Sequence, residues 1–409
     1  MKLENLKTPV YVIDENKLED NLKILMDLEH RAGCKILLAQ KAFSNFFEYP
    51  LVAKYISGCT ASGLYEARLG REEMNKENHV FSPAYKDEDF VELASICDHI
   101  IFNSINQLEH HRPVWEKAGV SVGLRINPEF STQGDHAIYD PCAPGSRFGV
   151  TYASLKKALD ENPDVLRNVD GIHFHTLCEQ NSDDLESTLE VVLDKFDFCL
   201  NGRKWINFGG GHHITRSDYD IDTLIHCINQ IKARYNCEVY LEPGEAIALD
   251  AGYLVTEVLD IVDNGIKTLI LDTSAACHMP DVLEMPYTPP LCDAIKVEDT
   301  GLDIWTINKM VKNGISIGKA MGKNIDDSFK HVYRLSSYTC LSGDNIGDYM
   351  TSKPINIGDK LVFSDMAIYS MVKNNTFNGI PLPDIAIMKD GECRVVKSFD
   401  YEDFKNRLG

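Results

Sequence analysis

The feature that most constrains this chain is a repeated alternation between short apolar runs and longer segments of helical periodicity. Eight runs of strand character lie between residues 34 and 244, namely "CKILLAQK", "SGCTAS", "HVFSPA", "HIIFNS", "SVGLRINP", "GIHFHTLC", "WINFGGG" and "EVYLEPG". Amphipathic segments such as "DEDFVELASI" and "LESTLEVVLDKF" separate them. Eight strands alternating with helices are the count of a parallel (βα)8 barrel. We therefore predict an α/β fold with a TIM-type barrel over residues 33–250.

Beyond residue 250 the pattern changes to strand-like runs with little helix between them. Examples are "YLVTEVLDIVD", "IKTLILDTS", "HVYRLSSYTC" and "DKLVFSDMAIYSM". This pattern predicts a mostly antiparallel β domain over residues 251–409. Residues 1–32 are expected to join it, because "PVYVID" at 9–14 reads as one more strand. A second domain also fits a chain of 409 residues, which is long for a single core.

Composition excludes some classes of partner. The formal net charge is −21, which disfavours nucleic acid and acidic membrane surfaces and is compatible with a cationic substrate. The first residues lack the apolar run of a signal peptide, and no segment approaches the roughly 20 apolar residues of a membrane span. Twelve cysteines occur without a C-x-x-C pair, as expected for reduced, mostly buried thiols. We expect a cytoplasmic protein.

Polar residues lie where a barrel places its chemistry. Active sites of such barrels are built at the C-terminal ends of the strands. The strand ends of this chain carry Lys41, Ser62, Arg125, His175, Gly209–Gly211 and Glu242. A lysine at a strand end is often a solvated terminus. At a barrel mouth it can instead be a desolvated amine, whose lowered pKa suits Schiff-base formation.

Two further motifs leave alternatives open. "GGG" at 209–211 makes either a plain turn or an anion site with free N–H groups, which barrels favour after strands seven and eight. His173 and His175 lie on one strand face. They are either metal ligands, as in a metal-dependent barrel hydrolase, or one structural histidine and one that packs on a flat ring. Further metal ligands are not obvious at other strand ends, so we expect no metal.

An amine, a glycine loop, a flat imidazole and a strand-end carboxylate together suggest pyridoxal 5′-phosphate. A carboxylate such as Glu242, paired with the pyridine nitrogen, keeps that nitrogen protonated and makes the ring an electron sink. Decarboxylation needs such a sink for the electrons that CO2 leaves behind.

The chain resembles the alanine racemase-like, fold type III pyridoxal-phosphate decarboxylases over nearly its whole length. The motifs are "AQKAF", "TAS", "LRINP", "HFH", "GGG", "EPG", "TCLSGD" and "DMAIYSMVKNNTFNG" in this order. By resemblance, Lys41 binds the cofactor aldehyde, His175 stacks on its ring and Glu242 meets its nitrogen. The phosphate is held by Gly209, Gly210, Gly211 and Tyr369. Cys340 returns the proton, and Cys340 and Asp344 reach in from the partner of a head-to-tail homodimer with shared sites.

Departures from the family pattern bear on the substrate. The family's "EPG" is normally followed by Arg, whereas this chain has Glu245, and Leu341 follows Cys340 where diaminopimelate decarboxylases have Glu. After His175, "TLCEQ" replaces a Gly-Ser phosphate contact. A reversed charge at Glu245 rejects a distal carboxylate and favours an amine.

The pattern is most similar to the branch that acts on carboxynorspermidine and carboxyspermidine in polyamine biosynthesis. Asp281, in "HMPDVLEMPY", is the predicted companion of Glu245 for the cationic chain; the alternative is an acid that caps a short helix. A diaminopimelate decarboxylase-like enzyme is the nearest rival. A non-catalytic relative that only binds pyridoxal phosphate is disfavoured, because such relatives are usually a barrel alone.

Overall fold

The computed structural model describes residues 3–134, 140–318 and 326–409. The chain forms two compact units, Met1–Leu18 with Leu249–Gly409, and Glu19–Ala248. The sequence prediction assigned residues 19–32 to the β domain, whereas they belong to the barrel unit. The reason is that Glu29, near the end of the first helix, accepts hydrogen bonds from the backbone of Ile36 (2.6 Å) and Ser57 (3.2 Å), which belong to the first two barrel strands or precede them.

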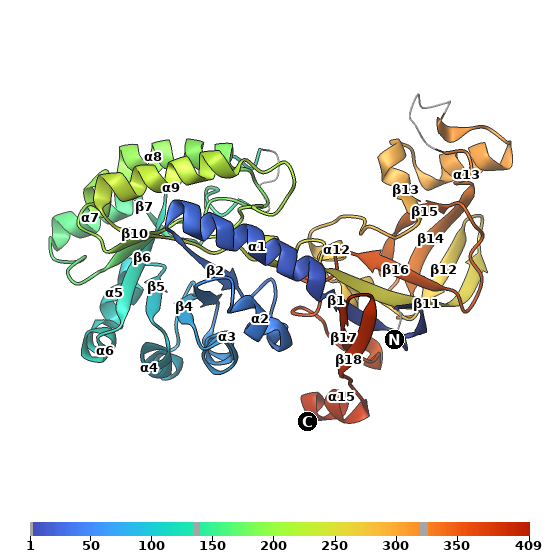
Figure 1. The fold of residues 1–409 in the computed structure, drawn as a ribbon, viewed down its shortest axis with the longest axis horizontal. Coiled ribbons are helices and arrows are strands. Elements are labelled where there is room, and N and C mark those ends of the chain that lie inside the picture. Colours follow the sequence, from blue (N-terminus) through green and yellow to red (C-terminus); the bar gives the residue numbers. More distant parts are fainter. Residues whose placement is uncertain (1–2, 135–139, 319–325) are drawn as a thin grey trace. The chain divides into compact units, whose positions relative to one another are not determined.

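Among the described residues, eight parallel strands close into the predicted barrel (Figure 1). They are β2 (Lys35–Ala39), β3 (Gly58–Ala61), β4 (Glu77–Phe81), β5 (His99–Phe102), β6 (Ser121–Asn127), β8 (Gly171–His173), β9 (Trp205–Asn207) and β10 (Glu238–Leu241). Their order is β5-β4-β3-β2-β10-β9-β8-β6, and the pairing of β5 with β6 closes the ring. A short strand, β7 (Val150–Thr151), extends β6.

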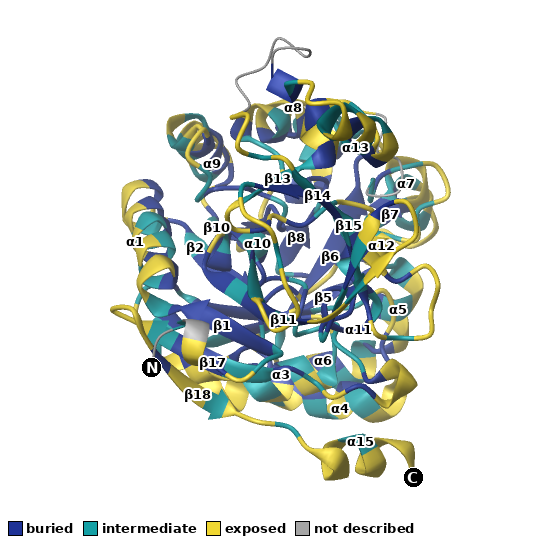
Figure 2. Ribbon diagram, turned by 90° about the vertical axis from the view of Figure 1, so that its right-hand side faces the viewer, coloured by how far each residue is buried: buried dark blue, intermediate teal, exposed yellow. Residues whose placement is uncertain are grey.

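Helices follow the barrel strands along the chain. They are α1 (Glu15–Ala32), α2 (Tyr49–Val52), α3 (Leu64–Leu69), α4 (Asp87–Ile96), α5 (Ile105–His110), α6 (Arg112–Ala118), α7 (Tyr152–Glu161), α8 (Ser182–Leu200), α9 (Ile221–Tyr235) and α10 (Glu245–Ala248). In Figure 2, α1 and α4 alternate between buried and exposed colours, as amphipathic helices should. No helix among the described residues is both long enough and apolar enough to cross a membrane.

A polar cluster fills the barrel at the N-terminal ends of the strands. Glu77 accepts hydrogen bonds from Lys35 (2.9 Å) and the Tyr240 hydroxyl (2.7 Å), and its Oε1 lies 2.9 Å from His79 Nε2. His99 lies beside this group, with its Nε2 3.9 Å from Glu77 Oε1. Since barrels place active sites at the opposite rim, this cluster has a structural role.

One tryptophan ring sets the size of two barrel positions. A side chain at Gly171 would place its Cβ 2.1 Å from the ring of Trp205, and one at Gly123 would come within 2.2 Å of it. Both distances are far shorter than a van der Waals contact, so glycine is required at Gly171 on β8 and at Gly123 on β6.

The second unit is a mixed sheet in which most pairs are antiparallel, as predicted. Its strands are β1 (Val10–Asp14), β11 (Gly252–Asp263), β12 (Lys267–Leu271), β13 (Ala294–Lys296), β14 (His331–Ser337), β15 (Asn345–Thr351), β16 (Lys360–Ser364), β17 (Asp384–Lys389) and β18 (Glu392–Lys397). The order is β13-β15-β14-β12-β11-β1-β17-β18, and β16 pairs with β11. β1 lies between β11 and β17, so the segment "PVYVID" does contribute a strand.

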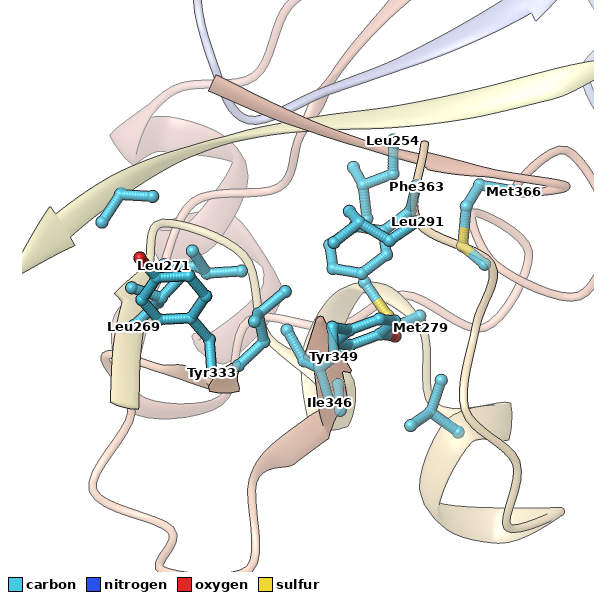
Figure 3. Packing of buried hydrophobic residues seen from close by; sticks show 14 of the residues in the cluster. Leu254, Leu269, Leu271, Met279, Leu291, Tyr333, Ile346, Tyr349, Phe363 and Met366 are labelled. Atoms are coloured by element: carbon cyan, nitrogen blue, oxygen red, sulfur yellow. The ribbon is translucent and has the colours of Figure 1, made fainter. Parts of the chain in front are cut away.

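Helices also occur in this unit, where the sequence indicated few. They are α11 (Ala275–His278), α12 (Asp281–Glu284), α13 (Ile304–Lys312) and α15 (Tyr401–Leu408). Its largest side chains pack in one cluster, in which Figure 3 shows the Tyr349 and Phe363 rings facing a common core with Met279 and Leu291. This core supports the turn between β14 and β15, which carries two predicted site residues.

Candidate active site

The barrel unit brings five predicted positions to the C-terminal ends of its strands. Lys41 follows β2, His175 follows β8, Gly209–Gly211 follow β9, and Glu242 and Glu245 follow β10. Parallel strands of a barrel all end at the same rim, so residues far apart in sequence meet there. Two hydrogen bonds join these positions, from Gly210 N to His175 Nδ1 and from Glu242 N to Gly209 O.

Glu242 is a buried carboxylate with two partners from neighbouring strands. Its Oε1 accepts a hydrogen bond from Asn207 Nδ2 (2.9 Å), and its Oε2 lies 3.2 Å from His173 Nε2. Burial alone would raise the pKa of Glu242, but the hydrogen bonds from His173 and Asn207 favour the ionised carboxylate and lower it. The carboxylate is therefore ionised at neutral pH, and its remaining lone pairs can accept a further N–H.

His173 serves Glu242 in this structure. Burial lowers the pKa of His173, so the ring is neutral and its Nε2–H is the donor toward the carboxylate. Clusters with metal-ligand spacing among the described residues are Glu77, His79 and His99, and Asp87, His110 and His111. Neither contains His173 or His175; of these two histidines, His173 contacts the Glu242 carboxylate.

His175 presents a neutral ring held by backbone contacts. Its Nδ1 accepts a hydrogen bond from Gly210 N (3.0 Å), and its carbonyl accepts one from Arg125 (3.1 Å). Burial, together with the positive charges of Lys41 and Arg125, holds the pKa of His175 well below its usual value. A neutral, fixed imidazole is suited to stacking on a flat ring.

The glycine loop needs its glycines. Gly209 and Gly211 have φ values of +71° and +82°, which other residues rarely adopt. A Cβ at Gly210 would lie 2.4 Å from the carbonyl oxygen of Glu242. The loop therefore lies directly against the strand end that carries the buried carboxylate.

Lys41 shows a feature of each alternative that the sequence left open, since it is exposed and yet has a lowered pKa. Its side chain is accessible to solvent, yet desolvation by the surrounding protein and repulsion from Arg125 lower its pKa. Gly244 of "EPG" packs against the next residue, since a Cβ there would lie 2.6 Å from the Ala42 Cβ. A lowered lysine pKa increases the fraction of neutral amine available for attack on a carbonyl.

These residues fit pyridoxal phosphate on the chemistry of their side chains. Glu242 is charged and can accept from a protonated ring nitrogen, while His175 is neutral and flat. Lys41 supplies a partly neutral amine, and Gly209–Gly211 allow close approach of an anion. The predicted cofactor therefore has a matching set of groups within one unit.

Glu245 has a partner within the same unit. Its Oε1 lies 3.3 Å from His213 Nε2, and His213 Nδ1 accepts from Arg216 (3.2 Å). Burial lowers the pKa of His213, but the nearby carboxylates, chiefly Glu245, raise it more. The sequence prediction of a substrate cation at Glu245 did not include this histidine. The only signal was the adjacent "HH" of "GGGHH".

Asp281 already has a cation. The ammonium of Lys373 contacts the carboxylates of both Asp281 and Glu284. Asp281 is the first residue of the short helix α12, and its side chain is 17% exposed. The N-cap of α12 is Pro280 and no side chain caps this helix, so the alternative of a helix-capping acid is wrong, and contact of Asp281 with a substrate stays a prediction.

Cys340 and Asp344 lie in one turn of the β unit but differ in exposure. Cys340 is exposed, and its N–H donates to Asn378 Oδ1 (2.8 Å). Asp344 is only 1% exposed, and its carboxylate accepts four hydrogen bonds from within its own unit. Both carboxylate oxygens thus have partners within this unit, and a direct role of Asp344 in substrate binding stays a prediction.

Tyr369 and the long loop after β6 complete the set of predicted positions. Tyr369 is half-buried and has a φ of +49°, an unfavourable conformation that is typical of functional positions. In the segment between β6 and β7, Arg147 O accepts a hydrogen bond from Asn103 Nδ2 (2.8 Å), and Gly149 N donates to Asn103 Oδ1 (2.7 Å). The segment "SRFGV" is thereby fixed to the barrel, and residues 135–139 lie outside the described residues.

Three residues of the site had no assigned role in the sequence analysis, namely Asn207, His213 and Lys373. Asn207 gave a weak signal, because a polar residue interrupts the apolar run "WINF" two positions before Gly209. Lys373 gave none, since its two acids are about ninety residues away.

Comparison with known proteins gives a consistent result. Residues 10–367 match the family model described as "Pyridoxal-dependent decarboxylase, C-terminal sheet domain". The chain is 39% identical to a carboxynorspermidine/carboxyspermidine decarboxylase of Campylobacter jejuni, and the alignment covers all of both chains. It is 37% identical to a carboxyaminopropylagmatine decarboxylase of Synechocystis sp., covering all of this chain and 97% of the relative.

A solved structure agrees with these relatives. The fold is similar to the crystal structure of carboxynorspermidine decarboxylase from Campylobacter jejuni in complex with norspermidine. The TM-score is 0.85 and the identity 37%, over 98% of this chain and 100% of that one.

Proposed function

The chain belongs to the pyridoxal-dependent decarboxylase family, and from this premise we propose that it decarboxylates carboxynorspermidine and carboxyspermidine to norspermidine and spermidine. The observation that carries the proposal is the 39% identity to a relative of that activity over the whole length of both chains. The enzyme is a carboxy-lyase of polyamine biosynthesis, with pyridoxal phosphate as its cofactor.

We assign each part of the cofactor to a different group of residues. Lys41 would hold the cofactor through its amine, Glu242 would bind the ring nitrogen and His175 would support the ring face. Gly209–Gly211, together with Tyr369 of the second unit, would hold the phosphate. When bound, pyridoxal phosphate supplies the sink for the electron pair that remains when CO2 leaves. Because His173 and Asn207 fix Glu242 and keep it ionised, the sink remains strong at neutral pH.

Cys340 returns the proton that completes the reaction. The bond from carbon to carboxylate breaks, CO2 departs, and the Sγ–H of Cys340 donates its proton to the carbon. Water then reprotonates the thiolate. Every cysteine of the described residues is a free thiol, as expected in the reducing cytoplasm to which we assign the protein.

A second copy of the chain supplies this thiol in a head-to-tail homodimer. The surface around Cys340 supports this assembly. Tyr338 is 38%, Leu341 43% and Phe377 48% exposed, and Phe377 precedes the residue that binds Cys340 N. Exposed apolar side chains grouped around a reactive residue are typical of a surface that another chain covers.

Glu245 selects a cationic substrate. Its side chain lies just past the end of β10 and is 19% exposed, so a substrate amine can compete with His213 for its charge. Diaminopimelate is disfavoured, because Glu245 would repel its distal carboxylate. Leu341, in place of a family Glu, also argues against that substrate.

A second candidate substrate is carboxyaminopropylagmatine, favoured by the 37% identity to the Synechocystis enzyme. It also presents a cation, but a guanidinium replaces an ammonium. Both substrates suit a carboxylate subsite, and they differ in the size and planarity of the cationic end.

The test is a decarboxylation assay with purified protein and added pyridoxal phosphate. Carboxynorspermidine, carboxyspermidine, carboxyaminopropylagmatine, diaminopimelate and ornithine are compared by kcat/KM. We expect the highest value for one of the two carboxylated triamines. A higher value for carboxyaminopropylagmatine would select the second candidate, and a preference for diaminopimelate or ornithine would overturn both.

A further inference from the structure

The turn that carries Cys340 is closed by a buried carboxylate. Asp344 Oδ2 accepts hydrogen bonds of 2.6 Å from three hydroxyl groups, those of Ser274, Ser337 and Thr339. Its Oδ1 accepts from the backbone N–H of Ala276 (3.1 Å). A carboxylate that is 1% exposed is costly unless its oxygens are satisfied, so this site is built around the charge.

The same residue determines the path of the turn. Ser337 is the last residue of β14, and Asp344 immediately precedes β15. Asp344 N donates to Leu341 O (2.9 Å), and Ser336 Oγ donates to Asp344 O (2.9 Å). Thr339, which the carboxylate binds, is the neighbour of Cys340. One side chain therefore fixes the start of the turn, its end and the residue before the thiol.

A second chain of contacts reaches Cys340 from the other side. Ala276, whose N–H binds Asp344, accepts a hydrogen bond at its carbonyl from Asn375 Nδ2 (2.8 Å). Three residues later, Asn378 Oδ1 accepts from Cys340 N (2.8 Å). The contacts run from Asp344 through Ala276 and the 375–378 segment back to Cys340, so the backbone of the cysteine is held on both sides while its thiol is exposed.

We propose that Asp344 is a positioning residue, which holds the Cys340 thiol in the one orientation that delivers a proton to the decarboxylated carbon. The proposal rests on the proposed function, because it needs Cys340 as the proton donor. It gives Asp344 an indirect role, separate from direct substrate contact. The chemical consequence is specific: with the thiol displaced, the substrate carbon would not receive the proton, and water would instead hydrolyse its C=N bond. The carbon would then leave as an aldehyde with the oxygen of that water, and the amino group would stay on the cofactor.

The experiment compares Asp344→Ala, Asp344→Asn and Thr339→Val with Cys340→Ala. The matched control is Asp348→Asn, because Asp348 lies on the following strand and pairs with Arg334 on the sheet surface (2.8 Å). Two quantities are measured: hydrogen–deuterium exchange of residues 337–345 in the protein without cofactor, and the ratio of aldehyde to amine among turnover products of carboxyspermidine.

We expect the amides of residues 337–345 to exchange faster in Asp344→Ala than in wild type. This variant should also form about tenfold more aldehyde than wild type. The increase should be smaller than in Cys340→Ala, because that variant loses the general acid itself, which contributes about 10²-fold or more. Asp344→Asn should recover part of both effects, since an amide can still bond with hydroxyls. Asp348→Asn should match wild type.

Faster exchange with a wild-type product ratio would overturn the proposal, because the hydrogen bonds of Asp344 would then stabilise the turn without affecting where the proton is delivered. Unchanged exchange and an unchanged product ratio would overturn it as well. If Asp344→Ala does not fold, Thr339→Val decides by the same criteria, since it removes one bond at the residue beside Cys340. A wild-type product ratio in Cys340→Ala would show that Cys340 is not the proton donor, and this result would also overturn the proposal. Failure of the whole proposed function would appear separately, as absence of CO2 release by the wild-type enzyme.

Discussion

Replacing Glu245 by Gln removes one charge and almost no volume at the rim of the barrel. The carboxylate is 19% exposed, and its nearest cation is His213, 3.3 Å away. Two unit charges 4 Å apart interact by about 4 kcal/mol at an effective dielectric constant of 20. Desolvation of the substrate amine and competition from His213 reduce this value. Charge-assisted hydrogen bonds contribute about 1.5–3 kcal/mol net, and the exposed position favours the lower end.

A loss of about 1.5–2 kcal/mol corresponds to a decrease of roughly 10- to 30-fold in kcat/KM for carboxyspermidine. Most of it should appear in KM, because the amine lies away from the reacting carbon and binds equally in ground and transition states. The absorbance of bound cofactor should be retained, since Lys41 and Glu242 are untouched. Asp218→Asn is the matched control, because Asp218 pairs with Arg216 in the same loop. It should change kcat/KM by less than about twofold.

The pH dependence gives a second readout. The pKa of His213 is raised by Glu245, with burial opposing. As pH falls through that raised value, His213 becomes charged and competes with the substrate for Glu245, so KM of the wild type should rise. Glu245→Gln should lose this rise. A wild-type kcat/KM together with an unchanged KM profile in Glu245→Gln would refute the assignment of a substrate cation to this carboxylate.

Three other outcomes follow from the site and the barrel. Lys41→Ala should lose the visible absorbance of bound cofactor and all turnover; wild-type turnover would remove the basis of the cofactor assignment. Cys340→Ala should slow turnover by about 10²–10⁴-fold and form aldehyde. Mixing it with Lys41→Ala chains should restore part of the activity, and no recovery would count against active sites that are shared between subunits. Burial, together with the neighbouring His79, lowers the pKa of His99 to about 2 in the folded protein. Below about pH 6.5 this histidine therefore binds a proton in the unfolded chain but not in the folded one, and the free energy of unfolding should decrease as pH drops from 7 to 5. His99→Phe should flatten this denaturant midpoint profile, and an equal slope in both proteins would exclude His99 as its source.

The barrel was predictable because its signal is local and repeated. Each strand is a short apolar run, and each following helix shows its own periodicity, so eight units can be counted without knowing how they meet. The strands missed in the second unit lack this signal. β13 is half-buried throughout, β18 is mostly exposed, and β15 contains Gly347 and Asp348. Edge position and turn residues obscure the alternation on which strand prediction depends.

Site residues divide in the same way. The positions of Lys41, His175, Gly209–Gly211 and Glu242 at strand ends could be predicted from sequence, because each follows an apolar run and strand ends of a barrel share one rim. The different hydrogen-bond partners of the two neighbouring acids could not be predicted from sequence. Glu242 and Glu245 are three residues apart, yet one is held by His173 and Asn207 and the other by His213.

The amino-acid sequence by itself determined the order of the βα units, the positions of reactive side chains at strand ends and the sign of charge after "EPG". Only the tertiary structure decided which group each acid contacts. Asp344 was predicted to face a substrate, and its carboxylate is enclosed by hydroxyls, one of them seventy residues away. Strand propensity and periodicity act between neighbours along the chain. A buried carboxylate is satisfied by whichever donors the closed sheet brings within about 3 Å, and that distance is set by packing between elements.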